Sequence, residues 1–181
     1  MPRPAPDLDA RRAQVLTTAR DLAEAEGWGA VTMRALAGAL GVTQPVLYTA
    51  YESRQALVDA VALAGYDELA DALEAADETA LARMRAYLEF AATRPRTYEV
   101  LFLPSDLAFG AEDTPAAMKR AFAALHPLFP DADGTHTEVV WALLHGLATL
   151  GAGGRLPASR AEARLDLAHD LLTRTDRAVG Q

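Results

Sequence analysis

The sequence predicts an all-α protein of about nine helices, on the evidence of its composition, its apolar spacing and its helix-end signals. Alanine is abundant and strand-favouring residues are sparse among the 181 residues, of which 51% are hydrophobic. Apolar residues recur three and four positions apart, and glycine or proline separates many of the successive runs. A chain of this length and apolar content can bury a sizeable core.

The first helix is expected over residues 8–26, after a proline-rich start at 1–7 that we expect to be disordered. An apolar stripe runs along this helix, and Gly27 and Gly29 end it. We interpret Trp28, which lies between these glycines, as a packing residue at the edge of a domain.

Residues 31–54 fit two short helices joined by a tight turn. Thr32 is expected to cap the first helix through its side-chain oxygen, and Gly41 to end it in the left-handed conformation. Thr43 is expected to cap the second helix, and Pro45 falls in its first turn, where a missing N–H is harmless. A glycine turn followed by a short helix with an exposed polar start is typical of a DNA-reading helix-turn-helix.

This spacing also fits an ordinary helical hairpin, and the residues that follow favour the DNA-reading alternative. The pattern Leu-Tyr-x-x-aromatic-x-x-basic ahead of a long helix is filled by Leu47, Tyr48, Tyr51 and Arg54. It resembles the signature of the TetR family of bacterial repressors, and residues 42–48, VTQPVLY, are similar to a recognition helix of that family. The resemblance implies that residues 1–54 form a three-helix DNA-binding domain.

The same resemblance implies which residues contact double-stranded operator DNA. Base edges are expected to be faced by Arg34, Gln44, Pro45 and Val46, since arginine suits guanine and glutamine suits adenine. Phosphate contacts, which fix the register of the protein without reading sequence, are expected from Thr32, Thr43, Tyr48 and Arg54. A two-fold dimer would read a palindrome.

Residues 55–181 are expected to form a ligand-binding and dimerisation domain. Ser53 is expected to cap a long helix that runs to about residue 76, and this helix is expected to be the only covalent route between the two domains. Asp77 is expected to cap the fifth helix, which ends at the Arg-Pro pair at 94–95.

Four more helices are expected in the second half of the chain. Thr114 and Pro115 begin the second of them, and Ser159 caps the last. The expected ranges are 96–102, 115 to about 125 or 129, 135–154 and 160–177, with 103–113 the least regular stretch and a turn at 130–134.

Trp141, His145 and Gly146 are similar to the Trp-His-Gly signature of one class of TetR-like regulatory domains. The resemblance implies a homodimer in which the last two helices pair with their copies. For His145 two interpretations stay open: a ligand-pocket residue, or a histidine satisfied at a helix–helix seam, which we favour.

The expected effector is a small hydrophobic or aromatic molecule of unknown identity, bound without a cofactor or metal ion. Most aromatic residues must belong to the core, and periodicity leaves open which of them line a cavity. The candidate ligand-binding residues are Leu63, Tyr66, Met84, Tyr87, Phe90, Tyr98, Phe102, Met118, Phe122, Trp141 and His145.

The net charge of −8 lies outside the expected DNA-binding domain, because residues 1–54 hold six arginines and six acidic residues. The absence of cysteine excludes disulfides and thiolate metal sites. No stretch resembles a signal peptide or a bilayer span, so we expect a cytoplasmic protein that does not associate with membranes.

The sequence offers no coherent catalytic site, so we do not expect an enzyme. The four histidines lack the spacing of a metal-binding pair, and no G-x-S-x-G motif is present. The expected function is a ligand-responsive transcriptional regulator, most often a repressor in the resembled family. The alternative is a helical protein-interaction module that no longer binds DNA.

Overall fold

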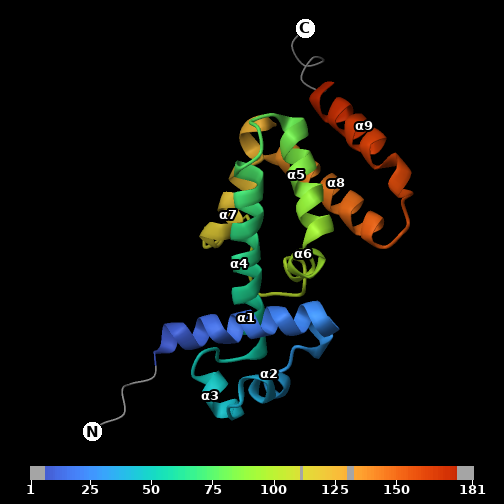
Figure 1. Cartoon of the computed structure of the whole chain (residues 1–181). Helices are drawn as coiled ribbons and strands as arrows, with labels where there is room; N and C mark the ends of the chain where they lie inside the picture. Colours follow the sequence, from blue (N-terminus) through green and yellow to red (C-terminus); the bar gives the residue numbers. More distant parts are fainter. Residues whose placement is uncertain (1–6, 111, 130–132, 175–181) are drawn as a thin grey trace. The chain divides into compact units, whose positions relative to one another are not determined.

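A computed structural model describes residues 7–110, 112–129 and 133–174, and these contain nine α-helices, three short 3₁₀ helices and no strand (Figure 1). The prediction of an all-α fold is confirmed. The described chain divides into two compact units. One contains the residues up to Gly65 together with Arg96–Ala108, and the other contains Tyr66–Pro95 together with the residues from Phe109 onward. Of the stretch predicted to be disordered, residues 1–6 lie outside the described residues, whereas Asp7 caps α1 by accepting from the Ala10 N–H at 3.0 Å, so the prediction is wrong for Asp7. Residues 130–132 of the predicted turn also lie outside the described residues.

The first unit is built from α1 (Leu8–Glu26), α2 (Met33–Leu40), α3 (Gln44–Tyr48) and the first half of α4 (Arg54–Glu74). Thr32 and Ser53 cap α2 and α4 as predicted, whereas the Thr43 side chain makes no capping bond at α3, against the prediction. The Thr32 hydroxyl accepts from the Ala35 N–H at 3.1 Å, and Ser53 Oγ accepts from the Ala56 N–H at 2.9 Å. The core of the unit is formed by Val15, Ala19, Leu36, Leu47 and Leu57, each fully buried.

A segment distant in sequence completes the first unit. The indole Nε1 of Trp28 donates to the Arg96 carbonyl at 2.8 Å, at the start of α6 (Pro95–Val100). Beyond this helix, the Gln55 amide donates to the Pro104 carbonyl at 3.1 Å. The chain therefore passes between the units three times, and the prediction that the helix after Ser53 is the only covalent route is wrong. The predicted domains, 1–54 and 55–181, do not coincide with these units, and a functional boundary at residue 54 stays a prediction.

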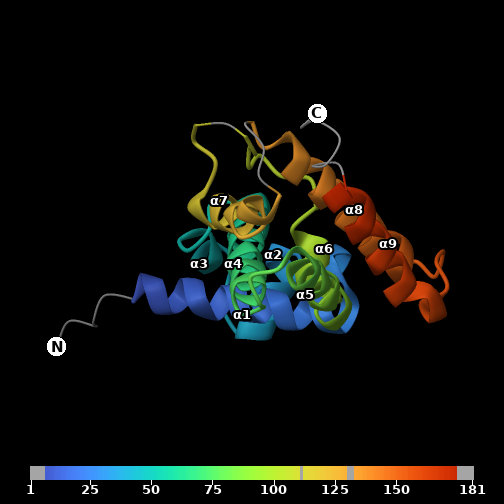
Figure 2. The same cartoon turned by 90° about the horizontal axis from the view of Figure 1, so that it is seen from above.

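The second unit contains the end of α4 with α5 (Ala80–Thr93), α7 (Ala116–Ala123), α8 (Thr135–Ala152) and α9 (Ala161–Arg174). Helix α5 packs against both α8 and α9 (Figure 2). The core of this unit is formed by Leu73, Met84, Tyr87, Val140 and Leu144, each at most 1% exposed.

Three predicted helix starts are corrected. Thr79, not Asp77, caps α5: its hydroxyl accepts from the Ala82 N–H at 3.2 Å, while the Asp77 carbonyl is used in the preceding turn. Helix α7 begins one residue after Pro115, whose backbone is extended, and ends at Ala123 without reaching 125. Ser159 lies inside a 3₁₀ turn before α9 and makes no capping bond there.

Candidate functional site

Helices α2 and α3 form a helix-turn-helix in the first unit. Gly41 ends α2 with φ 64°, in the left-handed conformation, and the next N–H, from Val42, donates to the Ala37 carbonyl at 3.0 Å. Leu47 is fully buried and fixes α3 to the unit, whereas Gln44 and Pro45 at the start of α3 are exposed. The arrangement presents the beginning of a short helix to a partner.

The predicted base-facing residues lie on this presented surface. Arg34, Gln44 and Pro45 are exposed, and Val46 is half-buried. The Arg34 guanidinium has no partner among the described residues and is available to a ligand. Their role as base contacts stays a prediction.

The predicted phosphate-binding residues differ in how their polar atoms are used. Thr43 occupies the capping position of α3, but its side chain makes no capping bond, so the hydroxyl is available. Tyr48 is 47% exposed. The Thr32 hydroxyl caps α2, as described above, and a hydroxyl that accepts one bond can still donate its proton.

Arg54 has an internal role. Its Nε donates to the Val31 carbonyl at 2.5 Å and a terminal nitrogen donates to the Trp28 carbonyl at 2.8 Å. The guanidinium thereby fixes the turn between α1 and α2 against the start of α4. A phosphate contact by Arg54 stays a prediction, and it would compete with these two bonds.

An open groove of about 610 Å³ lies between the beginning of α1 and the helix-turn-helix. Its α1 side includes Arg11, which we did not predict as a site residue. Among the described residues, no acidic side chain lines the groove, whose residues there are Leu8, Arg11, Gly41, Val42, Thr43, Val46 and Thr49.

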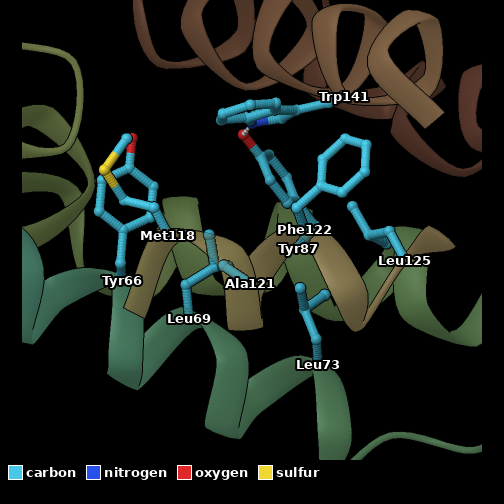
Figure 3. A pocket seen from close by; sticks show the side chains of 9 residues that line it. All are labelled: Tyr66, Leu69, Leu73, Tyr87, Met118, Ala121, Phe122, Leu125 and Trp141. Carbon is cyan, nitrogen blue, oxygen red and sulfur yellow. Dashed lines mark hydrogen bonds between the residues drawn. The ribbon is translucent and has the colours of Figure 1, made fainter. Parts of the chain in front are cut away.

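The second unit contains a small internal cavity of about 10 Å³, close to the space that one water molecule needs (Figure 3). Two of its polar groups are already paired, because Trp141 Nε1 donates to the Tyr87 hydroxyl at 3.1 Å. Burial raises the pKa of the Tyr66 phenol to about 12. The described part of the chain contributes no charged side chain to the lining, which consists of Tyr66, Leu69, Leu73, Tyr87, Met118, Ala121, Phe122, Leu125 and Trp141.

Five of the predicted ligand-binding residues line this cavity: Tyr66, Tyr87, Met118, Phe122 and Trp141. The other six do not. Met84 and Phe90 are buried elsewhere in the second unit, and Leu63, Tyr98 and Phe102 belong to the first. The sequence interpretation missed Leu69, Leu73, Ala121 and Leu125. Leu69 and Leu73 lie three and seven residues after Tyr66 on one helix, so this spacing could have identified them.

His145 lies on α8 outside the cavity lining. Its Nε2 is 3.5 Å from the Thr149 hydroxyl one turn later, and partial burial lowers the pKa of the imidazole. A lowered pKa keeps the ring neutral at neutral pH. Both interpretations of His145 stay predictions.

Helices α8 and α9 expose large apolar side chains. Val139 and Leu150 on α8 are 52% and 40% exposed, and Leu167 and Leu171 on α9 are each 59% exposed. A Cβ atom added to Gly146, between the two α8 residues, would meet no atom within 4 Å. Exposed apolar surface of this kind marks an interaction site more often than an isolated apolar residue does.

Within the described ranges, no helix combines the length and apolar character needed to cross a membrane. The same residues contain no group of three or more His, Cys, Asp or Glu side chains arranged to hold a metal ion.

Two family profiles match the chain. Residues 15–61 match the profile of bacterial regulatory proteins of the tetR family, and residues 79–174 match the tetracyclin repressor-like C-terminal domain. The chain is 30% identical over 131 residues to the HTH-type transcriptional regulator AlkX of Mycobacterium tuberculosis. This match covers 66% of the chain and 62% of the relative, which is less than two thirds of the relative's length.

Solved structures share the fold. A protein with unknown function from Rhodococcus sp. RHA1 is 26% identical, with a TM-score of 0.63 and coverage of 97% of this chain and 98% of that one. A tetR-family transcriptional regulator from Streptomyces coelicolor is 23% identical, with a TM-score of 0.69 and coverage of 94% and 83%.

Proposed function

The chain belongs to the TetR family of bacterial regulatory proteins, and from this membership we propose that it is a repressor that leaves a palindromic operator when a small hydrophobic effector binds. It is a transcriptional regulator with a helix-turn-helix DNA-binding domain. The observation that carries the proposal is the presentation of α3, where Leu47 anchors the helix and its polar start stays exposed.

The proposed reading of DNA follows from side-chain chemistry. Arg34 can donate two hydrogen bonds to one guanine, Gln44 can pair with adenine, and the Val46 methyl groups can contact a thymine methyl. In a mobility-shift assay, we expect the protein to retard a duplex from the intergenic DNA upstream of its own gene in preference to an excess of unrelated duplex. Gln44→Ala should reduce the preference for this duplex, because one base contact is lost, without lowering the melting temperature, because the side chain is exposed. Failure to bind any duplex at low salt would contradict the function.

The proposed dimer is formed by α8 and α9. The exposed leucines and Val139 on these helices would be covered by the same surface of a second copy, as in an isologous two-fold interface. Two DNA-binding domains related by a two-fold axis read half-sites whose centres lie about 34–36 Å apart, or a multiple of that distance. The operator is therefore proposed to be palindromic.

The cavity of the second unit supports an uncharged, mainly apolar effector. Its walls are aliphatic and aromatic, and its lining includes the polar groups of Tyr66, Tyr87 and Trp141, of which the Trp141 indole N–H already donates to the Tyr87 hydroxyl. A charged molecule would lose its hydration there without gaining an ionic partner from the lining. Because the present space is so small, binding requires the walls to move apart.

Helix α4 is the proposed link between effector and operator. It is one continuous helix from Arg54 to Glu74, and it carries Tyr66, Leu69 and Leu73 to the cavity. Displacement of these residues would therefore be passed to the start of the same helix. Moving a dimer from 99% to 1% DNA-competent requires about 5.5 kcal/mol of differential affinity.

The switch is tested in two steps. A thermal-shift screen of uncharged aromatic and aliphatic compounds should identify one that raises the melting temperature. Calorimetric titration of that compound, with and without saturating operator duplex, should then give different affinities, because coupling between two sites is reciprocal. Equal affinities would exclude this mechanism and leave DNA binding itself unaffected.

A further inference from the structure

The arginines of the first unit are not equally available to DNA. Among the described residues before Gly65, three guanidiniums are held by the protein: Arg12 donates to the Ala50 carbonyl at 3.1 Å, Arg20 to the Thr97 hydroxyl at 3.3 Å, and Arg54 to two carbonyls. Arg11 and Arg34 have no side-chain partner in the described part of this unit. The chain's one lysine, Lys119, lies in the second unit.

Arg11 lies beside the recognition helix. It is half-buried in the first turns of α1 and lines the groove to which the helix-turn-helix contributes Thr43, Val46 and Thr49. Thr43 contributes the hydroxyl that makes no capping bond. A cation and a hydroxyl thus border one open groove to which the described part of the chain contributes no carboxylate.

We propose that this groove binds the sugar–phosphate backbone of the operator, with Arg11 of α1 and the Thr43 hydroxyl holding one phosphate beside the base-reading residues of α3. The inference rests on the proposed function, because it requires α3 to face DNA. Arg11 then supplies the ionic phosphate contact that the sequence pattern assigned to Arg54, whose guanidinium already holds Trp28 and Val31.

The groove suits a nucleic-acid backbone in its other residues as well. Leu8 and Val42 provide apolar surface for deoxyribose, and Gly41 provides backbone without a side chain. Contacts to phosphate and sugar make up half to two thirds of the hydrogen bonds in protein–DNA interfaces. A contact of this kind contributes affinity without base preference.

The experiment measures the salt dependence of duplex binding by fluorescence anisotropy. The probes are a fluorescein-labelled duplex from the upstream intergenic DNA and a scrambled duplex of the same length. Arg11→Gln should weaken binding to both duplexes. It should also reduce the slope of log K against log salt by about 0.9 for each phosphate that is no longer neutralised, or by about two for a dimer. Arg11→Lys should keep most of the slope, because a lysine still neutralises one phosphate.

Two controls separate the possible outcomes. Arg155→Gln removes an exposed arginine of the second unit that has no side-chain partner in the described residues, and it should leave the slope unchanged. Arg54→Gln should lower the melting temperature because it releases two carbonyls, whereas Arg11→Gln should not. An unchanged slope for Arg11→Gln, with normal wild-type binding, would overturn the inference and leave the proposed function intact. If the wild type binds neither duplex at low salt, the proposed function fails first.

Discussion

The guanidinium of Arg120 on α7 donates to both carboxylate oxygens of Glu74 on α4, from Nε at 2.9 Å and from a terminal nitrogen at 2.5 Å. The same guanidinium donates to Asp71 at 2.6 Å and lies 3.7 Å from Asp67. The three carboxylates follow one face of α4 at intervals of four and three residues. These contacts raise the pKa of Arg120 and lower the pKa of Glu74.

This cluster joins two walls of the cavity. Helix α7 supplies Met118, Ala121 and Phe122 to the lining, and α4 supplies Tyr66, Leu69 and Leu73 (Figure 3). Every member of the cluster is solvent-accessible, so salt weakens it more than it weakens the apolar contacts beneath.

We expect Arg120→Gln to lower the melting temperature by a few degrees at low salt and neutral pH, and by less in high salt. The pKa of Glu74 is lowered in the folded state, so its contribution to stability is present above the ordinary value of 4.5 and is lost as the pH falls. The difference between wild type and variant should therefore shrink in acid. Circular-dichroism melts at neutral and acidic pH, each in low and in high salt, test this. The control is Lys119→Gln, which removes the same charge from the same helix. A difference unaffected by pH and salt would contradict it.

Tyr66 predicts how stability falls in alkali. The folded-state pKa is raised from 10.0 to about 12, so the unfolded chain loses this proton first and stability falls as the pH rises between these values. A shift of two units corresponds to about 2–3 kcal/mol at the upper end of the window. Urea unfolding across this range should show a shallower loss for Tyr66→Phe than for the wild type. Tyr48→Phe, at an exposed position, should follow the wild type.

Arg34 tests base reading. We expect Arg34→Ala to lose about 1–3 kcal/mol of binding free energy, concentrated at one base pair of the operator. The measurement is a set of competition assays with duplexes in which each base pair is replaced in turn. An equal loss on every duplex would show that Arg34 contacts phosphate instead.

Leu171 tests the dimer. A glutamate at this exposed position of α9 should give monomers in sedimentation and remove operator binding, because the charge would be buried against a second copy. Leu147 on α8 is a poorer site for a charge, since its side chain is half-buried in its own chain. Leu8→Glu, an equally drastic change at an exposed leucine of the first unit, should leave the dimer intact. A wild type that is monomeric at micromolar concentration would contradict the interface.

Helix ends were the most predictable part of the fold, because their signals are local. Thr32, Gly41 and Ser53 each act within four residues of their own position, and each has the predicted role. Where two acceptors stood close together, as Asp77 and Thr79 do, the sequence could not rank them. In the structure Thr79 has the extended backbone of a capping residue, with φ −124° and ψ 147°.

Long-range pairings were not predictable from periodicity. The bond from Trp28 to the Arg96 carbonyl joins residues 68 positions apart and places the start of α6 with the first unit. The sequence pattern likewise assigns a phosphate contact to Arg54. Only the structure shows that the Arg54 guanidinium donates to internal carbonyls, whereas Arg11 lines the open groove. For the cavity, the sequence interpretation selected mainly aromatic residues and missed aliphatic residues that line it beside them.

Because the cavity has almost no free space, an effector can bind only the form of the protein in which the cavity is open. If the open form is populated at about one part in a hundred, the observed dissociation constant is a hundredfold larger than the constant for the open form alone. Substitutions that loosen α7 would then tighten effector binding without touching the molecule, by making the open form more common. The fraction of the protein that is in the open form without effector, as well as the fit of the effector to the cavity, would set the concentration at which such a regulator responds.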